Sequence, residues 1–164
     1  MRRVVPLLLA ACPLAVSAEI AQQPGLWEVT ITIHPGEGMP DLPPEALLLM
    51  EQAGLQNPFK PFSREVCVTP DQVAKGAVPA FQDEDSGCAV TNGQRKGDVI
   101  TADFACNGDI KGKGDLKTTL TSPTSYVGDT RFAGSGADGM VLNMTSDFRG
   151  KWLAASCGRV QPIR

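Results

Sequence analysis

Histidine is nearly missing from this sequence, and its scarcity removes two kinds of active site. His34 is the only histidine in 164 residues. Catalytic zinc sites usually combine several histidines with carboxylates or thiolates, and a Ser–His–Asp triad would have to be built around this one residue. His34 precedes Pro35-Gly36 at the end of an apolar stretch, so we expect an exposed residue at a strand end. The sequence predicts no metal site and no cofactor.

The cysteines also lack the spacing that metal and redox sites need. No Cys-x-x-Cys occurs, and the gaps between the five cysteines are long. Tetrahedral zinc sites and thioredoxin-like redox pairs both use closely spaced cysteines. The acidic run Asp83-Glu84-Asp85 has neither the alternating oxygen ligands nor the central glycine of an EF-hand, and we interpret it as a solvated loop.

Long apolar runs and basic stretches are missing as well. After residue 18 no apolar segment approaches the ~20 residues that a membrane-spanning helix needs. The first 18 residues hold two of the 15 basic residues and none of the 18 acidic ones, so the rest has 13 basic residues and a net charge of −5. An acidic domain without a Lys/Arg stripe repels phosphate backbones. We therefore expect no transmembrane span after residue 18 and no nucleic-acid partner.

The N-terminus, by contrast, is typical of an export signal. Met1-Arg2-Arg3 is positively charged, an apolar run follows from Val4 through Ala11, and Val16-Ser17-Ala18 has the small-x-small pattern of a signal-peptidase site. Cleavage after Ala18 leaves 146 residues, a length that suits one domain. The sequence thus predicts a signal peptide over 1–18, a single disulfide-bonded domain over 19–164, and a periplasmic or secreted location.

Cys12 offers a second way to process the same segment. Leu9-Ala10-Ala11-Cys12 resembles the lipobox of bacterial lipoproteins, in which the cysteine carries lipid and becomes the new N-terminus. The apolar run before Cys12 is very short, and apolar residues continue beyond it to Ala18. We therefore favour cleavage after Ala18 and keep a lipid anchor at Cys12 as the alternative.

The other four cysteines predict two disulfides, because an even number in an exported protein is typical of a disulfide framework. Cys88 and Cys106 flank a polar, glycine-rich connection. A hairpin folded at the middle of that connection sets the two cysteines opposite each other and aligns the neighbouring apolar residues on one face. Asn92-Gly93 is a competing turn signal that would shift this register. By elimination, the second disulfide joins Cys67 to Cys157.

Alternating apolar residues predict a mainly β domain. The strongest strand runs from Leu26 to Ile33, where every second residue from Trp27 onward is apolar. Other strands are predicted over 62–68, on both sides of the hairpin, and over 114–121, 125–132, 140–148 and 151–157. About eight short strands with one or two short helices indicate an antiparallel sheet, curled or closed like a small barrel-like meander.

Two helical segments are predicted between these strands. The first runs from Pro43 to Ala53 with Asp41 as its cap. Its Leu47–Met50 run is apolar nearly all round, so we expect the helix to lie against the sheet. Thr69-Pro70-Asp71-Gln72 has the pattern of a capping box with proline at the first helical position, which predicts a short helical turn.

Several landmarks occur together in the arrangement of one known family. They are Pro24-Gly25-Leu26-Trp27-Glu28-Val29-Thr30, Cys67-Val68-Thr69-Pro70, lone cysteines at 88 and 106, Met144-Thr145, and Gly150-Lys151-Trp152-Leu153 before Cys157. Over nearly the whole chain after residue 18, this combination resembles the bacterial exported proteins of the domain of unknown function 3617 family. The chain departs from it by lacking a glycine just before Cys157. The resemblance implies export, four cysteines and a compact β-rich domain, and it implies no reaction.

Trp27 and Trp152 are the weak candidates for ligand binding. They lie in the first and last predicted strands. They could line an apolar ligand site inside a half-open barrel, or they could pack the two ends of the sheet together. A large aromatic residue buries ~150–250 Å², and we favour the packing role.

No convergent set of acid and base residues can be named, so we expect a protein that is not an enzyme. The leading hypothesis is a periplasmic module that binds a small apolar ligand, a lipid or an envelope protein partner. One alternative is an envelope lipoprotein anchored through Cys12. Another is a hydrolase that uses carboxylates.

Overall fold

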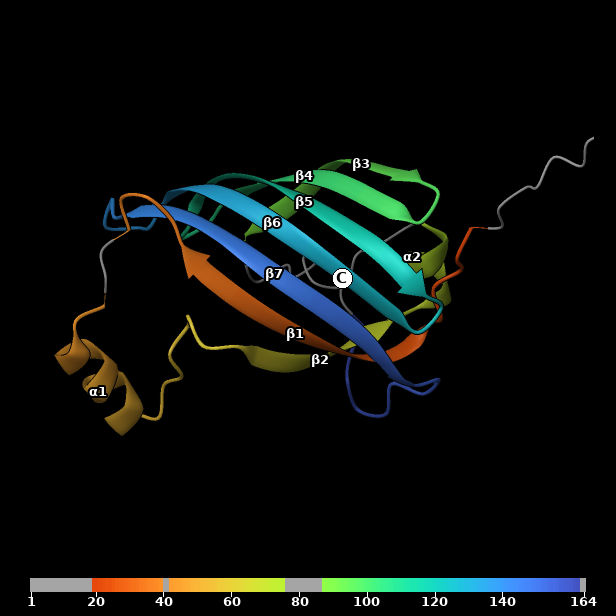
Figure 1. Cartoon of the computed structure of the whole chain (residues 1–164), viewed down its shortest axis with the longest axis horizontal. Coiled ribbons are helices and arrows are strands. Elements are labelled where there is room, and N and C mark those ends of the chain that lie inside the picture. Colours follow the sequence, from red (N-terminus) through yellow and green to blue (C-terminus); the bar gives the residue numbers. More distant parts are fainter. Residues whose placement is uncertain (1–18, 40–41, 76–86, 163–164) are drawn as a thin grey trace, which may run out of the picture.

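The computed structural model of the chain describes residues 19–39, 42–75 and 87–162, and it shows one curled sheet (Figure 1). Seven antiparallel strands lie in the order β2-β1-β7-β6-β5-β4-β3. They are β1 (Gly25–Pro35), β2 (Phe62–Val68), β3 (Cys88–Lys96), β4 (Val99–Asn107), β5 (Lys111–Ser122), β6 (Ser125–Ser135) and β7 (Val141–Ala154). The predicted mainly β, curled antiparallel sheet is confirmed. Among the described strands β2 and β3 form open edges, so the sheet does not close into a barrel.

Consecutive strands from β3 to β7 pair as a meander, and β7 then pairs with β1. The first strand therefore lies beside the last one, with β2 outside it. One predicted boundary is wrong, because the segments 140–148 and 151–157 do not form two strands. β7 continues through Gly150, which lies opposite Tyr126. A Cβ at Gly150 would lie 2.1 Å from two carbons of the Tyr126 ring, so this glycine makes room for a side chain and does not end a strand.

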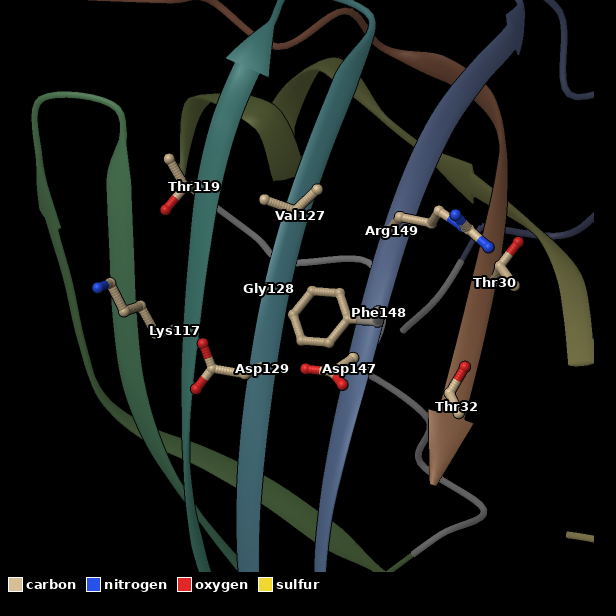
Figure 2. A pocket seen from close by; sticks show the side chains of 10 residues that line it. All are labelled: Thr30, Thr32, Lys117, Thr119, Val127, Gly128, Asp129, Asp147, Phe148 and Arg149. Carbon is tan, nitrogen blue, oxygen red and sulfur yellow. The ribbon is translucent and has the colours of Figure 1, made fainter. Parts of the chain in front are cut away.

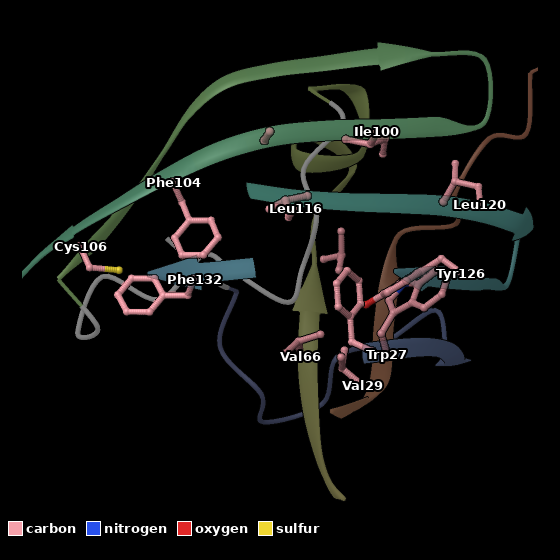
Figure 3. Packing of buried hydrophobic residues seen from close by; sticks show 13 residues of the cluster. Trp27, Val29, Val66, Ile100, Phe104, Cys106, Leu116, Leu120, Tyr126 and Phe132 are labelled. Carbon is pink, nitrogen blue, oxygen red and sulfur yellow. The ribbon is translucent and has the colours of Figure 1, made fainter. Parts of the chain in front are cut away.

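The core lies on the concave face of the curl (Figure 3). Strand alternation turns every second side chain to this face. The buried cluster consists of Trp27, Val29, Val66, Val68, Ile100, Ala102, Phe104, Cys106, Leu116, Leu120, Tyr126, Phe132 and Phe148.

Aromatic rings on the concave face lie over glycines of the neighbouring strands. Besides the ring over Gly150, the register sets Phe148 opposite Gly128 and Phe104 opposite Gly114. A Cβ at Gly128 or Gly114 would lie 2.2 or 2.3 Å from the facing ring. Glycine in a strand costs stability unless another group needs the space. Here the missing side chains let large rings fill the inner side of the curl, where room is smallest.

The β3–β4 hairpin has the predicted register, with Cys88 directly opposite Cys106. The chain reverses at Gly97, whose φ is 61°. The competing Asn92-Gly93 signal forms a register shift within β3, with Asn92 at a φ of 51°. An irregularity of this kind on an edge strand hinders pairing with other strands.

Two disulfides lie on the two faces of the sheet. Cys88 and Cys106 are bonded next to the concave core. Cys67 alternates with the inward-facing residues of β2 and is bonded to Cys157 in the C-terminal segment. That segment also pairs Pro162 with Cys67. These are the two pairs that the sequence analysis favours.

The short helix α2 (Pro70–Ala74) has the predicted capping box. The Thr69 hydroxyl accepts from the backbone N–H of Gln72 at 3.2 Å, and the Gln72 side chain accepts from the Thr69 N–H at 2.8 Å. Both donors at the start of the helix are thereby satisfied.

The longer helix α1 (Pro44–Gln52) contradicts its prediction. It has no buried residue and no substantial contact with any described strand, and it projects from the end of the sheet in the connection between β1 and β2 (Figure 1). The predicted cap Asp41 lies outside the described residues. An apolar composition calls for burial but does not specify the surface that provides it, and this is why the prediction failed. Neither of the two described helices has the length and apolar character to cross a bilayer.

Candidate functional site

The two tryptophans pack the first strand against the last. Trp27 and Trp152 lie directly opposite each other in β1 and β7. Trp27 is fully buried, with its ring centroid 5.3 Å from that of Tyr126, and Trp152 is half-buried. The indole N–H of Trp27 donates to the carbonyl of Gln23 at 2.9 Å, and that of Trp152 donates to the carbonyl of Pro24 at 3.0 Å. The ring of Trp27 and the indole N–H groups of both residues are thus occupied by the chain itself.

A few polar groups are enclosed within the concave face. Thr130 and Ser146 share a hydrogen bond of 2.6 Å. Within the described part of the chain, the Tyr126 hydroxyl and the Thr118 hydroxyl are buried without a hydrogen-bond partner. Burial raises the pKa of Tyr126 well above its usual value, and the positive charge of Arg64 lowers it only in part. The Tyr126 phenol is therefore neutral over the physiological pH range.

The opposite, convex face holds a hollow of about 480 Å³ across β1, β7, β6 and β5 (Figure 2). Its polar lining residues are at positions that alternate with core residues along the strands, so they point away from the core. They are Thr30, Thr32, Lys117, Thr119, Asp129, Asp147 and Arg149. We call this site the convex hollow.

The strand register sets the charges of the convex hollow in one row. Lys117 on β5 lies opposite Asp129 on β6, and Asp129 lies opposite Asp147 on β7. Thr32 on β1 completes the row. Like charges placed directly opposite each other on a sheet are destabilising. The pair of aspartates therefore weakens the fold locally.

Most of these charged groups have no ion-pair partner in the part of the chain that the structure describes. Among the described residues, His34 Nε2 lies 2.9 Å from Asp147 Oδ2, and no carboxylate lies within 4.0 Å of Lys117 or Arg149. The His34 side chain is about half exposed, at 51%, and lies near the end of β1, where the sequence predicts it. The convex hollow thus presents cationic and anionic groups to solvent, beside three threonine hydroxyls.

This arrangement suits a polar ligand with charges of both signs. Arg149 and Lys117 can donate to an anionic group, and Asp129 and Asp147 can accept from ammonium or hydroxyl groups. Within the described ranges, no group of three or more His, Cys, Asp or Glu residues is arranged to hold a metal ion.

The sequence analysis did not identify the convex hollow. Its candidates were the cysteines and the two tryptophans, together with Cys12, which lies outside the described residues, as does Asp83-Glu84-Asp85. The signal was present in the polar positions of the alternating strands, but which of them meet is decided by the register. No single strand reveals that Asp129 faces Asp147.

A curled antiparallel sheet with two disulfides and a polar hollow on its outer face defines the class of this domain. Residues 22–157 match the profile described as "Protein of unknown function (DUF3617)", and the chain belongs to that family. It is also similar to the "Uncharacterized protein in lpd-3 5'region" of Pseudomonas putida, with 32% identity over 134 residues, 72% of this chain and 92% of the relative. No solved structure matches the chain.

Proposed function

We propose that this protein is an exported, non-enzymatic binding module that takes a small polar ligand in the convex hollow. The ligand class is zwitterionic: an anionic group for Arg149 and Lys117, and an ammonium or hydroxyl group for the two aspartates. The observation that carries the proposal is the set of charges of both signs that lie together in one hollow without pairing with each other.

The packed concave face argues against the interior as a binding site for an apolar ligand. Trp27 and Tyr126 are at most 1% exposed and in ring contact with each other. A ligand that used Trp27 would have to displace this packing, which a large buried aromatic residue resists. The convex face requires no such rearrangement.

Export through the signal peptide of residues 1–18 is part of the proposal, with the domain over 19–164 in the periplasm or secreted. Two features support it. The disulfides suit an oxidising compartment. The chain is also held to the sheet two residues after the expected cleavage site, since the Ile20 N–H donates to the Asp98 carboxylate at 2.7 Å and Arg95 donates to the Ile20 carbonyl. A lipid anchor at Cys12 would change the tether and leave the convex hollow as it is.

Calorimetric titration of the purified domain with zwitterionic probes tests the function. A short peptide with free termini and glucosamine 6-phosphate serve as probes, and N-acetylglucosamine serves as the uncharged control. We expect Arg149→Ala and Asp147→Asn to weaken binding of the charged probes by about tenfold or more, because each variant removes a charged hydrogen-bond partner. Lys113→Ala, an exposed lysine outside the hollow, is the matched control and should bind as the wild type does.

Three outcomes would overturn the proposal. The first is equal binding by Lys113→Ala and Arg149→Ala. The second is binding of an apolar dye with a change in tryptophan fluorescence, which would return the site to the concave face. The third is turnover of a probe that is lost in Asp129→Asn, which would favour the carboxylate hydrolase.

A further inference from the structure

The sequence contains two Asn-Gly pairs, and the fold places them in different surroundings. Asn92-Gly93 lies within β3, and Asn107-Gly108 lies at the end of β4. An asparagine before a glycine readily loses its side-chain amide, because glycine has no Cβ to shield its backbone nitrogen from the preceding side chain. In an unfolded chain the two pairs should react alike, so a difference between them in the folded protein comes from the fold.

Asn92 lies in the irregular part of an edge strand. The register of β3 with β4 passes from Thr91 to Gln94, so Asn92 and Gly93 have no partner in the register of this hairpin. Asn92 has a left-handed φ of 51°, and both residues are exposed on the outermost strand of the described sheet. A Cβ at Gly93 would meet no atom within 4 Å. This part of β3 can therefore open locally at a small cost in free energy.

Asn107 is held more firmly. It lies opposite Lys111 in the β4–β5 ladder, and its N–H donates to the Gly87 carbonyl at 2.9 Å. The Gly108 nitrogen is crowded as well, because a Cβ built at Gly87 would lie 3.0 Å from it. Cys106, immediately before Asn107, is part of a disulfide. The backbone at Asn107 therefore cannot rearrange without breaking several contacts.

The reaction at an Asn-Gly pair needs no reagent other than water. The backbone nitrogen of Gly93 would attack Cγ of Asn92, which forms a C–N bond and closes a cyclic imide. The bond from Cγ to Nδ2 breaks, and the side-chain nitrogen leaves as ammonia with the proton that the Gly93 nitrogen gives up. Water then adds to one of the two imide carbonyls and opens the ring to aspartate or isoaspartate.

Conversion of Asn92 would reverse the sign of its contact with Asp103. Asn92 Nδ2 donates to Asp103 Oδ2 at 3.0 Å, whereas an ionised carboxylate can only accept hydrogen bonds. Asp103 lies opposite Asp115, so a third negative charge would join two existing ones, and like charges on adjacent strands destabilise a sheet. The same conversion at Asn107 would place a carboxylate opposite Lys111, which is a favourable pair.

We propose that Asn92 is a site of spontaneous deamidation, and that its conversion loosens β3 from β4 at the edge of the sheet. The Cys88–Cys106 disulfide keeps one end of the hairpin joined, so the change is confined to the strand around Asn92. The convex hollow is lined by residues of β1, β5, β6 and β7. The modification therefore stands independently of ligand binding in that hollow.

Peptide mapping of the folded, disulfide-bonded domain during incubation at mildly alkaline pH tests the modification. We expect deamidation at Asn92 to be at least about tenfold faster than at Asn107, because less free energy is needed to open the chain there. In the reduced chain in urea, the two sites should react at similar rates. Gly93→Ala, for which the structure has room, should slow the reaction at Asn92 by about tenfold and leave Asn107 unchanged, since its methyl group shields the attacking nitrogen.

Hydrogen exchange tests the consequence for the hairpin. Asn92→Asp reproduces one of the two products, and it should speed amide exchange in β3 by at least about threefold through the repulsion from Asp103. Asn107→Asp introduces the same charge opposite Lys111 and is the matched control, in which β3 should exchange as in the wild type.

The proposal fails on any of three results. Equal rates at Asn92 and Asn107 in the folded domain would mean that the fold does not select between the two pairs. An Asn92 that stays intact in the folded domain while the unfolded chain reacts would mean that the edge strand protects it. Unchanged exchange of β3 in Asn92→Asp would remove the loosening of the hairpin.

Discussion

The concave and convex faces of the sheet are formed by the same strands but differ in packing and in charge. On β7, Phe148 and Gly150 point into the curl and are buried, whereas Asp147, Arg149 and Lys151 alternate with them and are exposed. The concave face is closed by rings packed over glycines. Among the described residues, Lys117, Asp129 and Arg149 on the convex face have no ion-pair partner, and Asp129 lies directly opposite Asp147, which contacts His34.

This difference separates the residues that hold the fold from those available for binding. Packing specifies the concave face so tightly that a single methyl group does not fit at several glycines. The convex face contains a local conflict of charge, and such conflicts persist in natural proteins mainly where function requires them. We therefore expect the two faces to respond differently to substitution, and three predictions test that expectation.

The largest effect is expected from the disulfides, one of which lies on each face. Replacing Cys67 and Cys157 with alanine opens a separation of 90 residues, and replacing Cys88 and Cys106 opens one of 18. The loop-entropy relation gives losses of roughly 4–5 and roughly 3 kcal/mol in the free energy of unfolding. Urea denaturation of the two double variants measures both. Equal losses would contradict this account, and so would non-reducing peptide maps that join Cys67 to Cys88.

The second prediction compares two neighbours on β7. Gly150→Val should lower the free energy of unfolding by about 3 kcal/mol or more, because its side chain would occupy the place of the Tyr126 ring. Lys151→Val, one residue further along and exposed, should change it by at most about 0.5 kcal/mol. Both are measured by urea denaturation under oxidising conditions. Similar losses in the two variants would mean that the faces do not differ in packing.

The fold could be predicted from the sequence wherever the local pattern and the tertiary packing agree. The alternation in β1 and the capping box at Thr69 are local signals, and both are confirmed. The register of Cys88 and Cys106 was also predictable, because a hairpin has few ways to pair. The predicted break between 148 and 151 was wrong, because only the position of Tyr126 on the next strand explains the glycine at 150.

The convex hollow and the placement of α1 could not be predicted in this way. The hollow depends on the order in which four strands are joined, and in particular on β7 lying between β6 and β1. A sequence pattern indicates which side of a strand is polar but not which strand is beside it. The predicted packing of α1 against the sheet was wrong for a different reason. Its apolar composition indicates burial, but the described strands do not cover it.

The contrast between the two faces is tested most directly by measuring the ionisation of Tyr126. Below about pH 10 the protein keeps its full stability during this measurement, because the phenol is neutral in both the folded and the unfolded state. Tyr126 is the only tyrosine in the chain, so phenolate absorbance reports this residue alone. Burial raises its pKa in the folded protein, whereas an unfolded tyrosine ionises near pH 10. The stabilisation from the neutral phenol is therefore complete below about pH 10 and is lost as the pH rises above it.

An alkaline titration followed by absorbance and by circular dichroism gives the answer, with Tyr126→Phe as the control for other sources of alkaline unfolding. We predict that no phenolate appears while the native circular dichroism persists, and that both signals change together. Phenolate that forms near pH 10 in a protein with native circular dichroism would show that water reaches the concave face. It would contradict the division between a sealed core face and a binding face.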